Sequence, residues 1–87
     1  MNVYDVKHLE GRGYVLIESK NVFEKLLTVG SEGFQGLVWE DTTDEYRGSA
    51  RWMLITPSGE AFKGTAKSVI GAANGVEDEL KSYLIFR

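Results

Sequence analysis

The sequence contains no cysteine, and that absence excludes several kinds of site. Without thiols, a chain cannot form disulfides, a thiolate nucleophile, or a cysteine-ligated zinc or iron–sulfur centre. The single histidine, His8, alternates with Tyr4 and Val6 and belongs to no Ser/His/Asp arrangement, so we expect it to be a packed or solvated side chain. We therefore predict a protein that is not an enzyme and that uses no metal or other cofactor.

The sequence also lacks long apolar segments and an excess of positive charge. No stretch approaches the roughly 20 apolar residues that span a bilayer, and residues 1–9 contain no apolar run typical of a signal peptide. The chain has 10 Lys and Arg against 13 Asp and Glu, so its net charge of −3 does not attract polyanions in general. We predict a cytoplasmic protein with no membrane partner, because the lack of cysteine favours a reducing compartment.

The length and composition predict one small domain. A chain of 87 residues, 43% of them hydrophobic, has room for one layer of sheet and one layer of helix. No repeat, low-complexity tract or linker divides it, and its only proline, Pro57, lies in a predicted turn. We predict a single domain over residues 1–87 of the α+β class. Its sheet is an antiparallel β-meander of about four to six strands, with one or two helices packed on one face.

The first third of the chain predicts a hairpin followed by a helix. Residues 4–8 alternate, glycines at positions 11 and 13 offer a tight turn, and residues 14–17 are typical of a buried strand. Together they predict a hairpin near residues 3–17. From residue 21 to residue 29, apolar side chains recur at helical spacing and Gly30 follows them, which predicts a short amphipathic helix.

The middle of the chain predicts a meander near residues 34–65. Alternation over Tyr46–Leu54 has period 2, and a Pro/Gly turn at residues 56–59 should fold this strand back onto residues 60–65. The expected partners across this hairpin are Leu54 with Phe62, Trp52 with Gly64, and Met53 with Lys63. The pairing places Trp52 on the core side, where its large indole lies over a glycine.

A third strand of the meander is expected at residues 34–39, in one of two registers. In the first, Phe34 and Val38 face the core together with Trp52, and Trp39 lies on the opposite face. In the second, Trp39 is buried instead. We favour the first register.

The C-terminal segment predicts a helix that lies on the sheet. Apolar residues recur every three or four positions from residue 66 to residue 84. Gly71 and Gly75 interrupt this stripe, each costs about 1 kcal/mol relative to alanine in a helix, and Asn74-Gly75 is also a turn signal. The segment is therefore either one weakened helix or two short ones, and residues 84–86 could instead form a final strand.

Two loop motifs resemble ligand sites without completing them. The acidic loop offers four carboxylates, those of Glu40, Asp41, Asp44 and Glu45. It lacks the glycine and the terminal glutamate of an EF-hand, so we expect a solvated loop. Residues 59–65 have the glycine spacing of a phosphate-binding loop, but Thr65 stands where that motif requires lysine. Neither motif predicts a ligand.

The predicted functional surface is the sheet face opposite Trp52. It combines basic with large apolar side chains, namely Leu37, Trp39, Arg47, Arg51, Met53 and Lys63. Aromatic residues, methionine and arginine are enriched at interfaces, and an apolar patch rimmed by charge commonly marks a binding site. If the helices cover only one face, these six residues meet solvent and should bind a partner. The alternative is a second small core that contains Trp39 and Met53.

From these features we expect a non-enzymatic module that occludes or bridges a larger partner protein. Small acidic proteins of phages and other mobile elements often inhibit their targets in this way, so an inhibitor or regulator is one form of this hypothesis. The alternative is binding of single-stranded RNA or DNA on the same face, by stacking on Trp39 or Tyr46 and by phosphate contacts from Arg47, Arg51 and Lys63. The acidic net charge disfavours that alternative. An exposed patch or edge strand could also close a homodimer.

Overall fold

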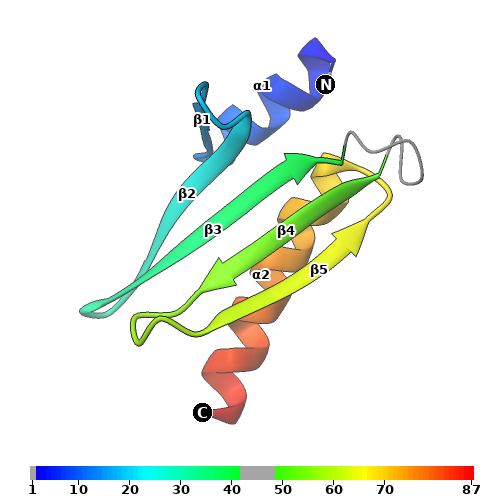
Figure 1. Cartoon of the computed structure of the whole chain (residues 1–87). Helices are drawn as coiled ribbons and strands as arrows, with labels where there is room; N and C mark the ends of the chain where they lie inside the picture. Colours follow the sequence, from blue (N-terminus) through cyan, green and yellow to red (C-terminus); the bar gives the residue numbers. More distant parts are fainter. Residues whose placement is uncertain (1, 42–48) are drawn as a thin grey trace.

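The computed structural model describes residues 2–41 and 49–87, which form an α+β domain. In chain order its elements are α1 (Val3–Gly11), β1 (Val15–Ile17), β2 (Val22–Val29), β3 (Glu32–Glu40), β4 (Ala50–Ile55), β5 (Ala61–Ala66) and α2 (Val69–Phe86). The five strands form one antiparallel sheet in the order β1-β2-β3-β4-β5, and α2 crosses one face of it (Figure 1). The predicted fold class is confirmed.

The meander of β3, β4 and β5 has the register that the alternation predicts. The three pairs expected across the β4–β5 hairpin are Cα partners: Leu54 with Phe62, Trp52 with Gly64, and Met53 with Lys63. In β3, Val38 is the partner of Trp52, and both Phe34 and Val38 are buried, which confirms the first of the two registers. The first residues of the predicted strand, 46–48, lie outside the described residues.

The prediction of an N-terminal strand was wrong, because residues 3–11 form the helix α1. The side chain of Asn2 accepts a hydrogen bond of 2.8 Å from the backbone N–H of Asp5, which caps the helix. Leu9 is fully buried, whereas Tyr4 is 70% exposed. Over so few residues, apolar positions can satisfy both a helical and an alternating period, so the cap and the packing of Leu9 decide the structure.

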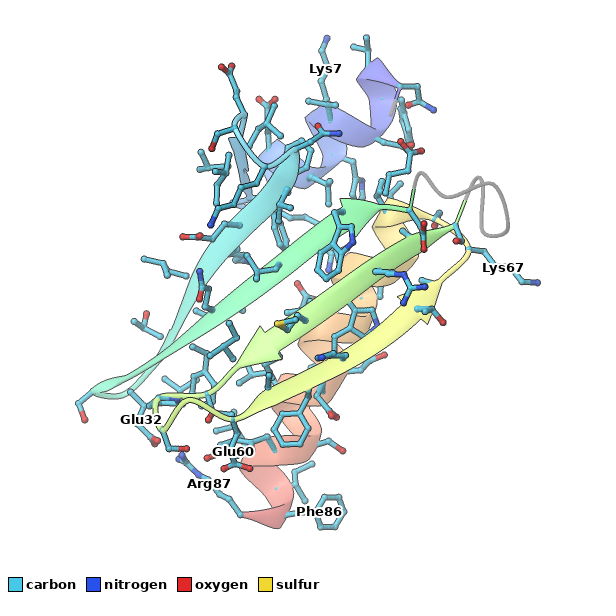
Figure 2. The ribbon with its side chains drawn as sticks, in the orientation of Figure 1. Lys7, Glu32, Glu60, Lys67, Phe86 and Arg87 are labelled. Carbon is cyan, nitrogen blue, oxygen red and sulfur yellow. The ribbon has the colours of Figure 1, made fainter. Side chains whose placement is uncertain are left out.

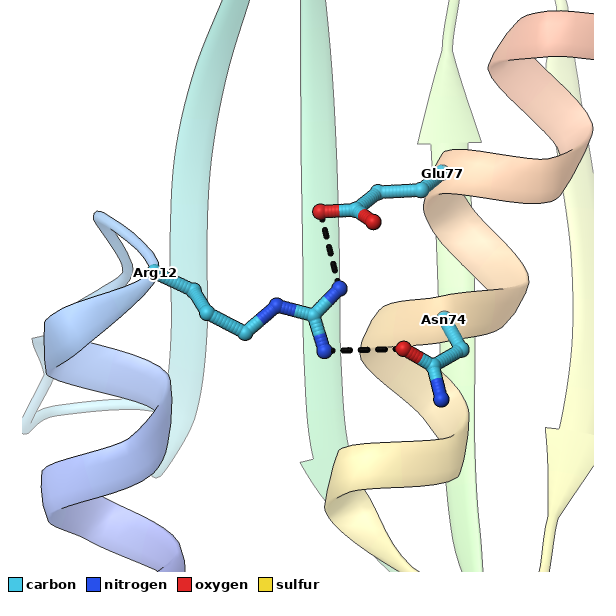
Figure 3. A network of polar contacts seen from close by, with 3 residues as sticks. All are labelled: Arg12, Asn74 and Glu77. Carbon is cyan, nitrogen blue, oxygen red and sulfur yellow. Dashed lines mark hydrogen bonds and ion pairs between the residues drawn. The ribbon is translucent and has the colours of Figure 1, made fainter.

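Arg12, which follows α1, joins this helix to α2. Its guanidinium donates a hydrogen bond of 2.9 Å to Oδ1 of Asn74 and lies 2.8 Å from Oε1 of Glu77 (Figure 3). Both acceptors stand one turn apart on α2, so one planar guanidinium contacts two helical positions. The contact therefore ties the end of α1 to α2, and α1 lies near β1 (Figure 1).

The prediction of a helix near residues 21–29 was also wrong, because these residues form the strand β2. Asn21 has a φ of 54°, so it belongs to the tight turn after β1 and is not a helix cap. β2 pairs with β3 over Phe23–Val29 and with β1 over Val22–Glu24, so both neighbours hold it in the sheet. Phe23 is buried on the face that α2 covers, whereas Leu26 is 73% exposed on the other face.

The C-terminal segment is one continuous helix and neither two helices nor a helix and a strand. Ser68 caps α2 by accepting a hydrogen bond of 3.0 Å from the N–H of Gly71. The helix begins later than predicted, because Ala66 is still the last residue of β5, and residues 84–86 remain helical. Of the two helices in the described chain, neither is long and apolar enough to cross a bilayer.

The core lies between α2 and the face of the sheet that it covers. Its buried side chains come from α1, from the residue that precedes β1, from the strands β2, β3 and β4, and from α2. They are Leu9, Tyr14, Phe23, Phe34, Val38, Ala50, Leu54, Val69, Ala72, Ala73 and Val76. Trp52, which we predicted to be a core residue, is half-buried and packs against this cluster. Since a sheet alternates its side chains, each core residue in a strand has neighbours on the opposite, uncovered face.

Candidate functional site

The uncovered face of the sheet, called the outer face below, carries the predicted site residues that the structure describes. Trp39 is the Cα partner of Arg51, Leu37 is the partner of Met53, and Met53 is also the partner of Lys63. The register therefore brings five of the six predicted residues together on adjacent strands. The sixth, Arg47, lies outside the described residues.

A groove runs across this face between β1, β2, β3 and β4. Its volume is about 240 Å³, and its lining residues are Ile17, Lys20, Val22, Glu24, Gln35, Leu37, Trp39 and Met53. Leu37, Trp39 and Met53 are half-buried by their neighbours in the sheet and still reach the groove. They are not enclosed in a second core among the described residues, because neither helix covers this side of the sheet (Figure 1).

Sequence analysis missed the part of the groove that β1 and β2 supply. Val22 and Glu24 alternate with the buried Phe23, so they point to the outer face. That alternation is visible in the sequence, but we interpreted the segment as a helix. The signal that could have found them is the β-branched character of Val22, Thr28 and Val29, which favours a strand.

A second hollow continues the groove toward the β1 edge. It has a volume of about 470 Å³ and is lined by Gly13, Val15, Ile17, Glu24 and Leu26. Ile17 and Glu24 line both hollows. Val15 and Leu26 are 68% and 73% exposed, so apolar side chains lie on the outer face from β1 to β4. A continuous apolar surface of this kind is typical of an interaction site.

The charges along the groove are mixed. Gln35 donates a hydrogen bond of 2.9 Å to a carboxylate oxygen of Glu24, which holds that carboxylate at the groove. Lys20 lines the same end, and Lys63 is exposed at the far side, beyond Met53. The surface therefore offers an apolar floor with both signs of charge at its margins.

Arg51 forms an ion pair with Asp41 that orders the end of β3 and β4. The Nε of Arg51 lies 2.6 Å from Oδ2 of Asp41, whose side chain is only 6% exposed against 40% for Arg51. The N–H of Asp41 also donates to the carbonyl of Ser49 at 2.9 Å, which extends the pairing of the two strands. A buried carboxylate needs such a partner, so Arg51 has a structural role at this site.

The ion pair corrects one prediction for the acidic loop. We expected a solvated loop, but Asp41 is buried and Glu40 belongs to β3, whereas Asp44 and Glu45 lie outside the described residues. Among residues 2–41 and 49–87, no group of three or more His, Asp or Glu side chains is placed to hold a metal ion.

Two buried polar atoms lie on the other side of the sheet, away from the groove. The hydroxyl of Tyr14 and Nε2 of His8 have no hydrogen-bond partner among the described residues. Burial raises the pKa of Tyr14 to about 12. His8 packs beside the ring of Tyr4, with 6.5 Å between the ring centroids. The described contacts place no nucleophile or orienting carboxylate beside either group. We therefore interpret both side chains as packed residues of the fold and not as catalytic groups.

The groove and the residues around it make the outer face the candidate functional site. No protein-family model matches the sequence, no curated protein shows significant similarity to it, and no solved structure matches the chain.

Proposed function

We propose that this chain is a non-catalytic protein-binding module and that the outer face is its docking surface. The observation that carries the proposal is the groove of about 240 Å³ in which Leu37, Trp39 and Met53 meet on a sheet face that neither helix covers. Tryptophan is enriched at interface hot spots and methionine at interfaces in general, and here both are half-buried beside charged residues. A small inhibitor or regulator that occludes a larger protein would use such a surface.

The chemistry of the groove favours a partner that inserts an apolar side chain. Leu37 and Met53 supply the floor, and the indole of Trp39 supplies one wall that can stack or accept an aliphatic group. Lys20 and Glu24 at the margin suit a partner surface with both signs of charge.

The same charges support a protein partner over single-stranded nucleic acid. A phosphate chain across the groove would pass the carboxylate of Glu24, and the charge of Arg51 is offset by Asp41 at 2.6 Å. Proteins that bind single strands combine stacking residues with a positively charged groove. Here the stacking residue Trp39 is present, but the net charge of the chain is −3.

The test is capture of partners from a lysate of the native host, with and without nuclease. The bait proteins are the wild type, a Leu37→Ala/Trp39→Ala variant, and a control variant, Thr28→Ala/Thr65→Ala, that alters exposed outer-face residues outside the groove. We expect a nuclease-resistant protein partner whose affinity falls by about 30-fold or more in the groove variant, because hot-spot truncations cost about 2 kcal/mol or more. The control should bind like the wild type.

Two results would contradict the proposal. The first is capture that nuclease abolishes, which would favour the nucleic-acid alternative. The second is a groove variant with an unchanged circular dichroism spectrum that binds the captured protein as tightly as the wild type.

A further inference from the structure

The sheet ends at β5, and this edge is a feature apart from the outer face. β5 is the last strand in the sheet order and pairs only with β4 among the described strands. The N–H of Thr56 donates to the carbonyl of Glu60 at 2.9 Å, which places these two residues in a hydrogen-bonded pair. Pairs in an antiparallel ladder alternate, so the backbone N–H and C=O groups of Ala61, Lys63 and Thr65 point away from β4.

This edge has little protection against pairing. Natural edge strands are commonly guarded by proline, by several charges or by a bulge. β5 contains no proline and one charged residue, Lys63, among small and apolar ones. Its pairing with β4 runs without interruption from Ala61 to Ala66, so no bulge bends it away. The free N–H and C=O groups are thus presented by a regular strand.

A groove lies beside the first half of this strand, on the side of the sheet that α2 covers. Its volume is about 460 Å³, and its lining residues are Glu60, Phe62, Glu79, Ser82, Tyr83, Phe86 and Arg87. Tyr83 packs edge-on against Phe62, with 6.1 Å between the ring centroids, and Phe86 is 83% exposed. Since strands direct alternate side chains to one face, a strand added to β5 would direct every second side chain toward this groove.

The groove is acidic. Glu60 and Glu79 line it, and neither forms an ion pair with a described residue. The one basic group, Arg87, lies 2.5 Å from Glu32, so its charge is already offset (Figure 2). Glu60, Phe86 and Arg87 lie at the same end of the molecule (Figure 2). A basic side chain that enters the groove would meet two carboxylates next to exposed aromatic surface.

A second copy of this chain does not supply that side chain. A copy that pairs through its own β5 would present to the groove the residues that share the face of Phe62. These are Glu60, Phe62, Gly64 and Ala66, none of which is basic. In an antiparallel pair of copies centred on Lys63, Glu60 would lie opposite Ala66 of the copy, so its carboxylate would gain no cationic partner.

We propose that the free edge of β5 binds an extended segment of a partner protein as a sixth strand. The segment carries an apolar side chain that packs on Phe62, Tyr83 and Phe86, and a Lys or Arg two residues away that contacts Glu60 or Glu79. The backbone groups of Ala61, Lys63 and Thr65 supply the pairing. This surface is separate from the outer face, because its groove lies on the other side of the sheet.

The experiment selects ligands for the full chain from a library of random 12-residue peptides displayed on phage. We expect enriched sequences in which an apolar residue and a Lys or Arg stand two positions apart. Synthetic versions of these peptides should bind a Glu60→Gln/Glu79→Gln variant about tenfold or more weakly than they bind the wild type, since two charge-assisted contacts are lost. No enrichment, or enriched peptides without basic residues, overturns the proposal.

A matched pair of variants tests the backbone pairing. Lys63→Pro removes an N–H that points to the free edge, where proline is tolerated, whereas Lys63→Ala keeps that N–H. We expect Lys63→Pro to abolish peptide binding and Lys63→Ala to retain it. If Lys63→Pro does not fold, methylation of alternate backbone nitrogens in the peptide tests the same contact without changing the protein. Binding that survives methylation in both alternating patterns overturns the proposal.

Two further measurements separate this proposal from its alternatives. The Leu37→Ala/Trp39→Ala variant should bind the peptides like the wild type, so the two surfaces can fail independently. Sedimentation of the wild type should show no dimer that forms through the β5 edge, that is, no dimer that the Lys63→Pro substitution dissociates. Such a dimer would mean that a second copy occupies the edge, and it would overturn the assignment to a partner segment.

Discussion

The backbone of α2 rests on the indole of Trp52 at Gly75. A Cβ built on Gly75 would lie 2.4 Å from Nε1 of that ring, closer than such atoms approach one another. A Cβ on Gly64, the partner of Trp52 across the hairpin, would lie 2.4 Å from the same ring. The indole therefore fills the space between a strand glycine and a helix glycine, and this contact sets how closely α2 approaches the sheet.

Gly75→Ala is expected to destabilise the domain by about 1 to 3 kcal/mol. Alanine improves helix propensity by about 1 kcal/mol, but its methyl group must displace either Trp52 or the helix, and overpacking of this kind costs more. The matched control is Gly11→Ala in α1, where nothing lies within 4 Å of the added Cβ. It should be neutral or stabilising. Urea denaturation measures both, and a Gly75→Ala variant as stable as wild type would show that the contact is not close.

Trp52→Ala is expected to cost about 3 to 5 kcal/mol of unfolding free energy, because two glycines cannot fill the space it leaves. The control is Trp39→Ala on the outer face, where the side chain borders a solvent-filled groove. That variant should lose clearly less stability. Denaturant midpoints measure the comparison if the unfolding free energies of the proteins depend equally on denaturant concentration. An equal loss of unfolding free energy in the two tryptophan variants would contradict the assignment of Trp52 to the core side.

Arg12→Ala is expected to weaken the docking of α1 and to change the pH dependence of stability. The Arg12 guanidinium donates to Glu77 and holds the pKa of that carboxyl below its usual value of 4.5. A lowered pKa in the folded state means that the contact stabilises the fold above pH 4.5 and is lost as pH falls through the folded-state pKa. Wild type should therefore lose more stability on acidification than Arg12→Ala does.

The magnitude of this effect is modest, because the side chain of Glu77 is 39% exposed to solvent. Unfolding free energies of both proteins across acidic pH measure the difference, since all other carboxyl groups are common to them. Parallel curves for the two proteins would show that the ion pair in Figure 3 contributes nothing to stability.

Tyr14→Phe is expected to leave the domain as stable as wild type at neutral pH, or more stable by up to about 1 kcal/mol. The ring is 2% exposed and its hydroxyl has no hydrogen-bond partner among the described residues, so its removal leaves nothing unpaired. The raised pKa adds a second expectation. Stability that is present below pH 10 should fall as pH rises toward 12 in the wild type, because the unfolded chain ionises first.

The phenylalanine variant lacks this alkaline loss, so the difference between the two curves isolates Tyr14. Unfolding free energies measured on both sides of pH 10 provide the test. A Tyr14→Phe variant that is markedly less stable at neutral pH would indicate a hydrogen bond to the hydroxyl that the described contacts do not contain.

The meander could be predicted from the sequence because its signals are local and agree with one another. Alternation fixes which side chains of β4 share a face, and the Pro57 turn fixes where the chain reverses. The small size of Gly64 then indicates where Trp52 belongs. In the favoured one of the two registers, Leu37 and Trp39 share the opposite face with Met53, so three of the eight residues that line the groove were predicted.

The N-terminal elements depend on contacts that the sequence does not display. Residues 3–11 and 22–29 are too short to be stable alone, and their apolar positions fit both a helical and an alternating period. Tertiary structure decides between them: Leu9 packs into the core beside α2, and β2 pairs with β3 over Phe23–Val29 and with β1 over Val22–Glu24. The groove residues Val22 and Glu24 could be placed only after that decision.

The sequence by itself determined the class of the fold and the register of the β4–β5 hairpin, because period-2 alternation is a property of the chain. The register of β3 was one of two alternatives until the packing of Phe34 and Val38 in the core decided it. Only the tertiary structure decided that α2 is continuous. Two glycines weaken its helix propensity, but Gly75 allows close packing on Trp52, and that burial offsets the loss. It also decided that Asp41 is buried against Arg51 and that β5 keeps a free edge, since both depend on which strands become neighbours.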